Sequence, residues 1–251
     1  MFEPERKTIF LYRHTSYGRS QIVPCNISRM TLADHREAER LHIDVTRGLS
    51  PEVFSPTPPE DLIRLLGDEG IALGVWYGPR LVSMRAIQTD RDWVNEVLVK
   101  MGMEAEIENR TAFTEHCIVD REFRGNNIQF ISHYKMENYI ADRFERITTT
   151  VSPRNPFSLK NVFACNFLVV GIKELYGGYT RYIMEKNFVS PASLWSKGHM
   201  VIPVLDIERQ RRLLAEGYVG YQMIRKDGAL NILYAPSCAE CPPRRGKSEK
   251  D

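Results

Sequence analysis

The segment IVDREFRGNNIQFI, residues 118–131, has the residue types of an anion-binding turn. Its pattern predicts the end of a strand, a short basic turn and the start of a helix, where free backbone N–H groups point toward a ligand. Arg124 adds a charged donor, and charge-assisted hydrogen bonds to phosphate are the strong kind. Loops of this kind usually carry several glycines, which let the backbone approach phosphate oxygens, but here Gly125 is followed by Asn126 and Asn127. The segment therefore predicts a phosphate-binding turn of unusual composition.

A candidate general base precedes this turn in the predicted strand TAFTEHCIV, residues 111–119. Strict alternation along a strand places Glu115 on the same face as the apolar Cys117 and Val119. A carboxylate among apolar neighbours is unfavourable unless it is paired or its pKa rises, and a raised pKa is what a general base needs. The alternatives are that Glu115 pairs with an arginine or faces solvent. His116, on the opposite face, is the second candidate.

The elements that must position these groups alternate between helical and extended patterns. Helical spacing and start or stop signals predict helices within residues 27–49, 58–67, 124–145, 155–166 and 206–217. Extended patterns predict strands at residues 8–12, 71–77, 80–87, 111–119, 146–151, 230–235 and on both sides of Gly177-Gly178.

Strands that alternate with helices and are followed by hairpins predict a mixed α/β sheet. We expect an N-terminal segment at residues 1–26, a main domain at 27–190, a C-terminal helix–hairpin extension at 191–236 packed on the same domain, and a disordered tail at 237–251.

Composition excludes several classes of protein. A net charge of +2 gives no basis for broad nucleic-acid or membrane binding. The N-terminal MFEPERKTIF lacks the apolar run of a signal peptide, and the longest apolar runs, such as FLVVGI, are too short to span a bilayer. We therefore expect a cytoplasmic protein.

The five cysteines do not suggest a disulfide framework, because their number is odd and Cys25, Cys117 and Cys165 are scattered. Cys238 and Cys241 have the spacing of metal ligands, but one such pair supplies only two of the four ligands of a structural zinc site. We expect no metal, with a zinc ion shared between subunits as the alternative.

The order of elements, with residues 118–131 at its centre, resembles the GNAT superfamily of acyl-CoA N-acyltransferases. The pyrophosphate loop of that family reads roughly V-D-x-x-[YF]-R-G-x-G-[IL]-[GA], and this chain matches it at Val119, Asp120, Phe123, Arg124, Gly125 and Ile128. A second family element is Val, Asn four residues later, a small residue three after that, and Gly-Phe at the helix end. This chain matches it at Val151, Asn155, Ser158 and Phe167, with Asn166 in place of the glycine. The resemblance covers residues 27–190.

The resemblance implies a splayed sheet flanked by helices and direct attack of an amine on the thioester of acetyl-CoA or a longer acyl-CoA. It implies that the backbone around residues 117–119 holds the acyl and pantetheine groups and that residues 124–129 hold the pyrophosphate. Some family members place a base nine residues before the loop arginine, which is Glu115 here. The implied coenzyme-binding residues are Cys117, Ile118, Val119, Arg124, Gly125, Asn126, Asn127, Ile128, Gln129, Asn155 and Ser158.

Three residues depart from the family pattern. Asn127 and Gln129 replace small loop residues, and Val162 stands where the family often has a tyrosine that protonates the leaving thiolate. Several other tyrosines are candidate acids, and the sequence does not choose among Tyr134, Tyr139, Tyr176 and Tyr179.

The first interpretation is an acetyltransferase acting on a primary amine of a small or amino-acid-like molecule, without a metal. The departures leave a second one open: a signal-lipid synthase that makes acyl-homoserine lactones or N-acyl amino acids and takes its acyl group from acyl carrier protein. Carrier-bound phosphopantetheine has no pyrophosphate, so its loop need not be rich in glycine. A third is a non-catalytic acyl-CoA sensor. A homodimer is compatible with each of them.

Overall fold

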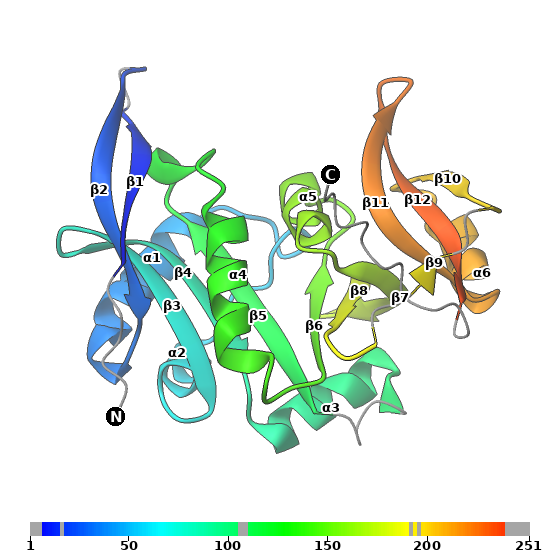
Figure 1. The fold of residues 1–251 in the computed structure, drawn as a ribbon, viewed down its shortest axis with the longest axis horizontal. Coiled ribbons are helices and arrows are strands. Elements are labelled where there is room, and N and C mark those ends of the chain that lie inside the picture. The colour runs from blue at the N-terminus through cyan, green and yellow to red at the C-terminus, as the bar shows by residue number, and fades with distance from the viewer. Residues whose placement is uncertain (1–6, 16–17, 105–109, 191–192, 195–196, 239–251) are drawn as a thin grey trace, which may run out of the picture. The chain divides into compact units, whose positions relative to one another are not determined.

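The computed structural model describes the 251-residue chain except for residues 1–6, 16–17, 105–109, 191–192, 195–196 and 239–251. The chain forms two compact units, residues 1–149 and 150–251 (Figure 1).

Among the described residues, the first unit is built on six strands in sequential order, and the last of them continues past residue 149 into the second unit. Neighbouring strands are antiparallel except for β5 and β6, which are parallel. The strands are β1 (Lys7–His14), β2 (Ser20–Arg29), β3 (Gly70–Tyr77), β4 (Arg80–Gln88), β5 (Thr111–Val119) and β6 (Arg146–Val151). The helices are α1 (His35–Thr46), α2 (Pro59–Leu66), α3 (Arg91–Met101) and α4 (Ile128–Ile140), with 3₁₀ turns at Leu32–Asp34 and Arg121–Phe123.

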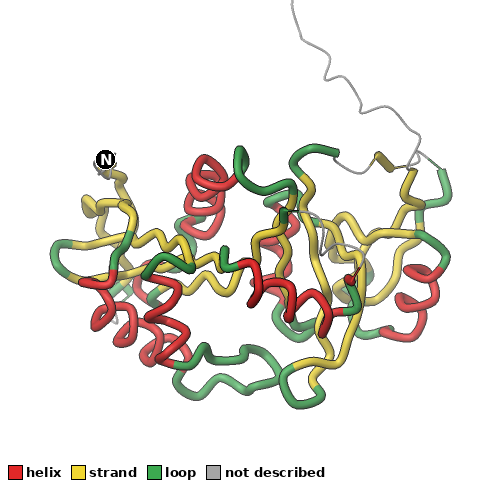
Figure 2. Tube along the Cα trace, turned by 90° about the horizontal axis from the view of Figure 1, so that it is seen from below, coloured by secondary structure: helices red, strands yellow, loops and turns green. Residues whose placement is uncertain are grey.

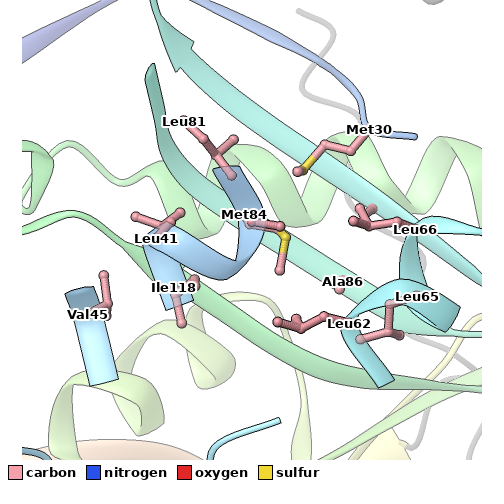
Figure 3. Close-up of a cluster of buried hydrophobic side chains, with 12 residues drawn as sticks. Met30, Leu41, Val45, Leu62, Leu65, Leu66, Leu81, Met84, Ala86 and Ile118 are labelled. Atoms are coloured by element: carbon pink, nitrogen blue, oxygen red, sulfur yellow. The ribbon is translucent and has the colours of Figure 1, made fainter. Parts of the chain in front are cut away.

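Helices lie on both sides of these strands (Figure 2). On one side, α1 and α2 pack on the sheet through a cluster that includes Leu41, Leu62, Met84 and Ile118 (Figure 3). On the other side, α4 crosses β4 and β5 (Figure 1). The second cluster, beside the start of α4, contains Val23, Val75, Val82, Val119, Phe123 and Ile128. Each face of the sheet is thus covered, and β5 contributes side chains to both cores.

The sheet opens between its two parallel strands. β5 continues to Val119, but the register with β6 covers only Thr111 to Phe113 of β5, opposite 146–148. The Thr149 hydroxyl donates one further bond to the Thr114 carbonyl at 3.0 Å. Beyond that point, in the part of the chain that the structure describes, β5 has no strand pair on its β6 side. The splayed sheet implied by the resemblance is therefore present.

The second unit is an antiparallel sheet with two helices. Its strands lie in the order β8-β7-β11-β12-β10, and β9 pairs with β12. Two buried tyrosines join the sheet to α6 and the preceding turn: the Tyr182 hydroxyl donates to the Val204 carbonyl, and the Tyr234 hydroxyl donates to Gln210 Oε1. The elements are α5 (Pro156–Ala164), β7 (Leu168–Leu175), β8 (Tyr179–Asn187), β9 (Ser193–Leu194), β10 (Met200–Pro203), α6 (Ile207–Ala215), β11 (Tyr218–Lys226) and β12 (Ala229–Cys238).

The predicted mixed α/β architecture with a C-terminal helix and hairpin is confirmed. The predicted helix signals also hold, because Pro59 occupies the first turn of α2 and Gly67 follows its end. The sequence patterns did not predict β2, α3 or the short strands β9 and β10. The start of α3 carries a signal, since Asp90 accepts the Trp93 N–H at 2.8 Å as an N-cap and Gly102 ends the helix with a φ of 74°.

The predicted start of the central helix at residue 124 is four residues too early, because residues 124–127 form the turn and α4 begins at Ile128. At the C-terminus, β12 runs to Cys238. Cys241 and the rest of the predicted tail lie outside the described residues.

No helix in the described ranges is both long enough and apolar enough to cross a membrane. Among the same residues, no three His, Cys, Asp or Glu side chains are arranged to hold a metal ion.

Candidate active site

Glu115 lies at a β-bulge in β5. His116 pairs with Ala86 of β4, and the next pair is Thr114 with Ile87, so Glu115 is an extra residue without an opposite partner on β4. Such bulges redirect a side chain and are common beside active sites. The prediction that Glu115 shares a face with Cys117 by strict alternation is therefore wrong, because the alternation rule assumes a regular ladder.

The bulge brings Glu115 to the loop between α1 and α2. The Thr57 hydroxyl in that loop donates to Glu115 Oε1 at 3.2 Å and lies 3.1 Å from His116 Nδ1. Thr57 is buried, whereas Glu115 is only half-buried. Adjacent residues of a regular strand point to opposite faces, so only the bulge lets both reach one hydroxyl. The sequence reading missed Thr57, which lies 58 residues from Glu115 in a stretch that reads only as a Pro-rich connection.

The acidity of Glu115 suits proton transfer near neutral pH. Burial raises the pKa of the Glu115 carboxyl to about 7, and the nearby carboxylate of Asp61 acts in the same direction, while the hydrogen bond from Thr57 opposes the shift. At neutral pH a large fraction of Glu115 is ionised and able to accept a proton, and its conjugate acid can release that proton to solvent.

His116 is held neutral. Burial lowers its pKa to about 3, and His42 and Arg85 act in the same direction. Burial also lowers the pKa of His42, whose ring meets that of His116 edge-on with 5.5 Å between centroids. Within the described residues, His116 Nε2 and both ring nitrogens of His42 are buried without hydrogen-bond partners. A base with so low a pKa captures few protons at pH 7, so Glu115 is the stronger candidate.

The turn that links β5 to α4 has the backbone expected of a close approach to a ligand. Gly125 has a φ of 83° and Asn127 a φ of 54°, both in the left-handed region, where glycine and then asparagine are tolerated best. Asn127 is the residue before the first helical turn, yet its side chain does not cap the helix, and that turn contains no acidic residue. The N-terminal N–H groups of α4 are therefore not capped by the N-cap side chain.

Arg124 is an exposed cation of this turn. Its Nε makes only a long bond of 3.4 Å to the Val119 carbonyl, and it has no carboxylate partner among the described residues. The acids nearby are already paired: Asp120 with Arg80, and Glu122 with Arg13 and Arg80. The guanidinium of Arg124 is thus available to an anion beside the uncapped helix start, and these residues fit the phosphates of a coenzyme.

Asn126 of the turn and Gln129 in the first turn of α4 make internal hydrogen bonds with their side chains. Asn126 Oδ1 accepts the Tyr12 N–H, and its Nδ2 donates to the Tyr12 carbonyl, each at 2.7 Å, so the side chain ties the turn to β1. Gln129 Nε2 donates to the Cys117 carbonyl at 3.0 Å. The Gln129 side chain therefore covers backbone to which the family resemblance assigns the acyl and pantetheine groups.

The other predicted coenzyme residues divide between the two units. Ile118 and Val119 are buried in the two cores of the first unit, and Ile128 begins α4. Asn155 and Ser158 lie in the second unit, where Asn155 Oδ1 accepts the Ser158 N–H at 3.0 Å and caps α5.

No protein-family model matches the sequence, and no curated protein matches it. Solved structures do match. The N-acetyltransferase from Staphylococcus aureus Mu50 is 14% identical with a TM-score of 0.51, covering 66% of this chain and 99% of that one. The GNAT domain of S. lividans PAT is 12% identical with a TM-score of 0.50, covering 72% and 96%. The acetyltransferase of the GNAT family from Streptococcus pneumoniae is 14% identical with a TM-score of 0.50, covering 65% and 98%.

Proposed function

From the premise that this chain has the GNAT N-acetyltransferase fold, we propose that it is an N-acyltransferase. In the simplest form, it transfers an acetyl group from acetyl-CoA to a primary amine of a small or amino-acid-like molecule. The observation that carries the proposal is Glu115, a carboxylate redirected by a bulge and tuned to a pKa of about 7. An acceptor amine must lose a proton in the reaction, and this group can take it.

The acyl-CoA supplies an acyl group activated as a thioester, and the chain supplies the proton acceptor. A primary amine is mostly protonated at pH 7, so a positioned base contributes about 10²- to 10⁴-fold to the rate. Glu115 Oε1 accepts from Thr57, and Oε2 has no partner among the described residues. Oε2 is therefore the atom that receives the proton as the amine attacks the thioester directly.

The turn at residues 124–129 supports a donor that carries phosphate. Uncapped N–H groups at the start of α4 and the unpaired Arg124 favour anions. A helix start alone contributes roughly 0.3–1 kcal/mol per anionic group, and Arg124 adds charge-assisted bonds. We assign the pyrophosphate of coenzyme A to this turn.

A donor carried by acyl carrier protein is the second candidate, and Gln129 favours it. The bond from its amide to the Cys117 carbonyl fills part of the space beside the strand. Asn126 is committed to β1, which leaves fewer groups for a pyrophosphate. A phosphopantetheine donor has one phosphate and makes fewer demands on this turn.

Glu115→Gln tests the proposal, because glutamine keeps the shape but cannot accept the proton. We expect the transfer rate to fall at least about tenfold, with coenzyme affinity by calorimetry nearly unchanged. In the wild type, kcat/KM should rise with pH through about 7, since only the deprotonated carboxylate works, and the variant should lose this step.

Glu39→Gln, at an exposed position of α1, is the matched control and should behave as the wild type. Equal rates for wild type and Glu115→Gln from about pH 6 to 9 would remove Glu115 from the mechanism. Absence of transfer in the wild type with a panel of amines and both donor types would overturn the proposed function itself.

A further inference from the structure

One hydroxyl joins two segments of the first unit beside the proposed base: the loop before α2 and the strand β5. Thr57 lies in the loop before α2, and its Oγ1 contacts both Glu115 Oε1 at 3.2 Å and His116 Nδ1 at 3.1 Å. The loop is stiff at this point, because Pro56, Pro58 and Pro59 surround Thr57 and restrict the backbone there. The hydroxyl is therefore presented from a fixed backbone and a buried site.

The number of available protons decides which group donates and which accepts in each of these two hydrogen bonds. A threonine hydroxyl has one proton to donate and lone pairs to accept. An ionised Glu115 can only accept, so it takes the Thr57 proton. His116 must then donate from Nδ1–H to Thr57 Oγ1, because the hydroxyl has no second proton. A neutral His116 with Nδ1–H leaves Nε2 bare, and Nε2 is the nitrogen that has no partner among the described residues.

We propose that Thr57 is a positioning residue for the transfer reaction: its hydroxyl, oriented by His116, holds Oε1 of the ionised Glu115 and leaves Oε2 toward the acceptor amine. The inference rests on the proposed function, since it assigns a role relative to that base. It also explains why a buried histidine that cannot act as a base at neutral pH lies next to Glu115.

The charged groups near Glu115 and His116 determine how the Thr57 hydrogen bond affects the pKa of Glu115. Asp61 of α2 acts on Glu115 and raises its pKa. Burial keeps His116 neutral by lowering its pKa, and His42 of α1 and Arg85 of β4 act in the same direction. The Thr57 bond is the contribution that lowers the pKa of Glu115 against burial and Asp61. Without it, Glu115 would be more protonated at pH 7 and less able to act as a base.

Thr57→Val removes the hydroxyl at nearly constant shape, and Thr57→Ser keeps it. The first measurement is the pKa of the Glu115 carboxyl by carbon NMR in the protein without substrates, assigned with Glu115→Gln. One hydrogen bond corresponds to about 0.5–1 pKa unit, so Thr57→Val should move the pKa upward by about that much. Thr57→Ser should stay close to the wild type.

The second measurement is the pH profile of kcat/KM. In Thr57→Val, the rising limb should move to higher pH by the same amount, and the activity near pH 7 should fall about two- to fivefold with partial recovery at high pH. A merely structural role would lower activity at every pH alike, so an unshifted profile would overturn the proposal. Thermal unfolding of each variant confirms that it is folded.

The third measurement is the tautomer of His116, which nitrogen NMR reads directly. Nδ1–H is expected, and Nε2–H would overturn the proposed direction of the bonds. Because the carboxyl titration and the tautomer need no turnover, they test Thr57 even if the chain transfers no acyl group. An unchanged Glu115 pKa in Thr57→Val would overturn the role of Thr57 and leave the proposed function standing.

Discussion

The starts of α4 and α5 carry the same residue type and use it in opposite ways. Each helix follows a strand, and each has asparagine at the position before the first helical turn. Asn155 has a φ of −111°, and its side chain accepts the Ser158 N–H. Asn127 has a φ of 54°, and its side chain caps nothing. One helix start satisfies a donor internally, and the other leaves its donors without a side-chain cap.

The difference shows that backbone conformation decides the role of the amide. An asparagine in an extended or nearby conformation turns its oxygen over the first helical turn. In the left-handed region, the residue instead permits a tight turn after Gly125, and its side chain does not cap the N–H groups of α4. The acids beside this turn are neutralised by Arg13 and Arg80, whereas Arg124 has no such partner within the described ranges.

The largest effect should come from removing the cation at the uncapped helix start. If this turn binds pyrophosphate, acetyl-CoA should bind at least about tenfold more tightly than acetyl-pantetheine, a difference of about 1.4 kcal/mol. Arg124→Ala should erase most of that difference, as measured by calorimetry with both ligands.

Arg209→Ala, at an exposed position of α6, is the control and should keep the full difference. Equal affinities of the wild type for the two ligands would contradict the proposal that the start of α4 binds the pyrophosphate. The acyl carrier protein would then become the favoured donor.

The cap of α5 should contribute to stability. Asn155→Ala removes the acceptor for the Ser158 N–H, so the free energy of unfolding should fall by about 1 kcal/mol. Asn155→Asp and Asn155→Ser retain a capping oxygen and should stay near the wild type in denaturant unfolding. If alanine and serine were equivalent here, the side-chain cap would carry no stability.

The smallest effect on stability should come from substitutions of Asn127. Position 127 should favour glycine, whereas position 155 should favour a side chain that caps the helix. Alanine is less favourable than asparagine in the left-handed region, so Asn127→Ala should lower the free energy of unfolding by roughly 0.5–1 kcal/mol. Asn127→Gly, which adopts this conformation freely, should be neutral or slightly stabilising.

The same denaturant experiment checks this pair of variants. Serine at position 127 should not rescue stability, in contrast to serine at 155. If serine rescued position 127 as well, Asn127 would be acting as a cap, and the two helix starts would not differ.

Much of the architecture follows from the sequence, because its signals are local. Residues 118–131 predict strand, turn and helix through the apolar run, the glycine and the basic residue, and all three are present. The helix α2 was readable from Pro59 and Gly67. The strand β2, which lies between β1 and β3 in the sheet, was not readable, because its apolar alternation is mixed with exposed polar and apolar residues and its pairing with β3 is a tertiary event.

By itself, the sequence determined the mixed α/β order, the position of the candidate anion-binding turn and Glu115 as the candidate base. Each of these depends on neighbours within a few residues, where spacing and backbone preference are decisive. Only the tertiary structure decided the bulge that redirects Glu115, the hydroxyl of Thr57 that meets it, and the bond that commits Asn126 to β1. These depend on the register of two strands and on segments 58 and 114 residues apart, which no local pattern specifies.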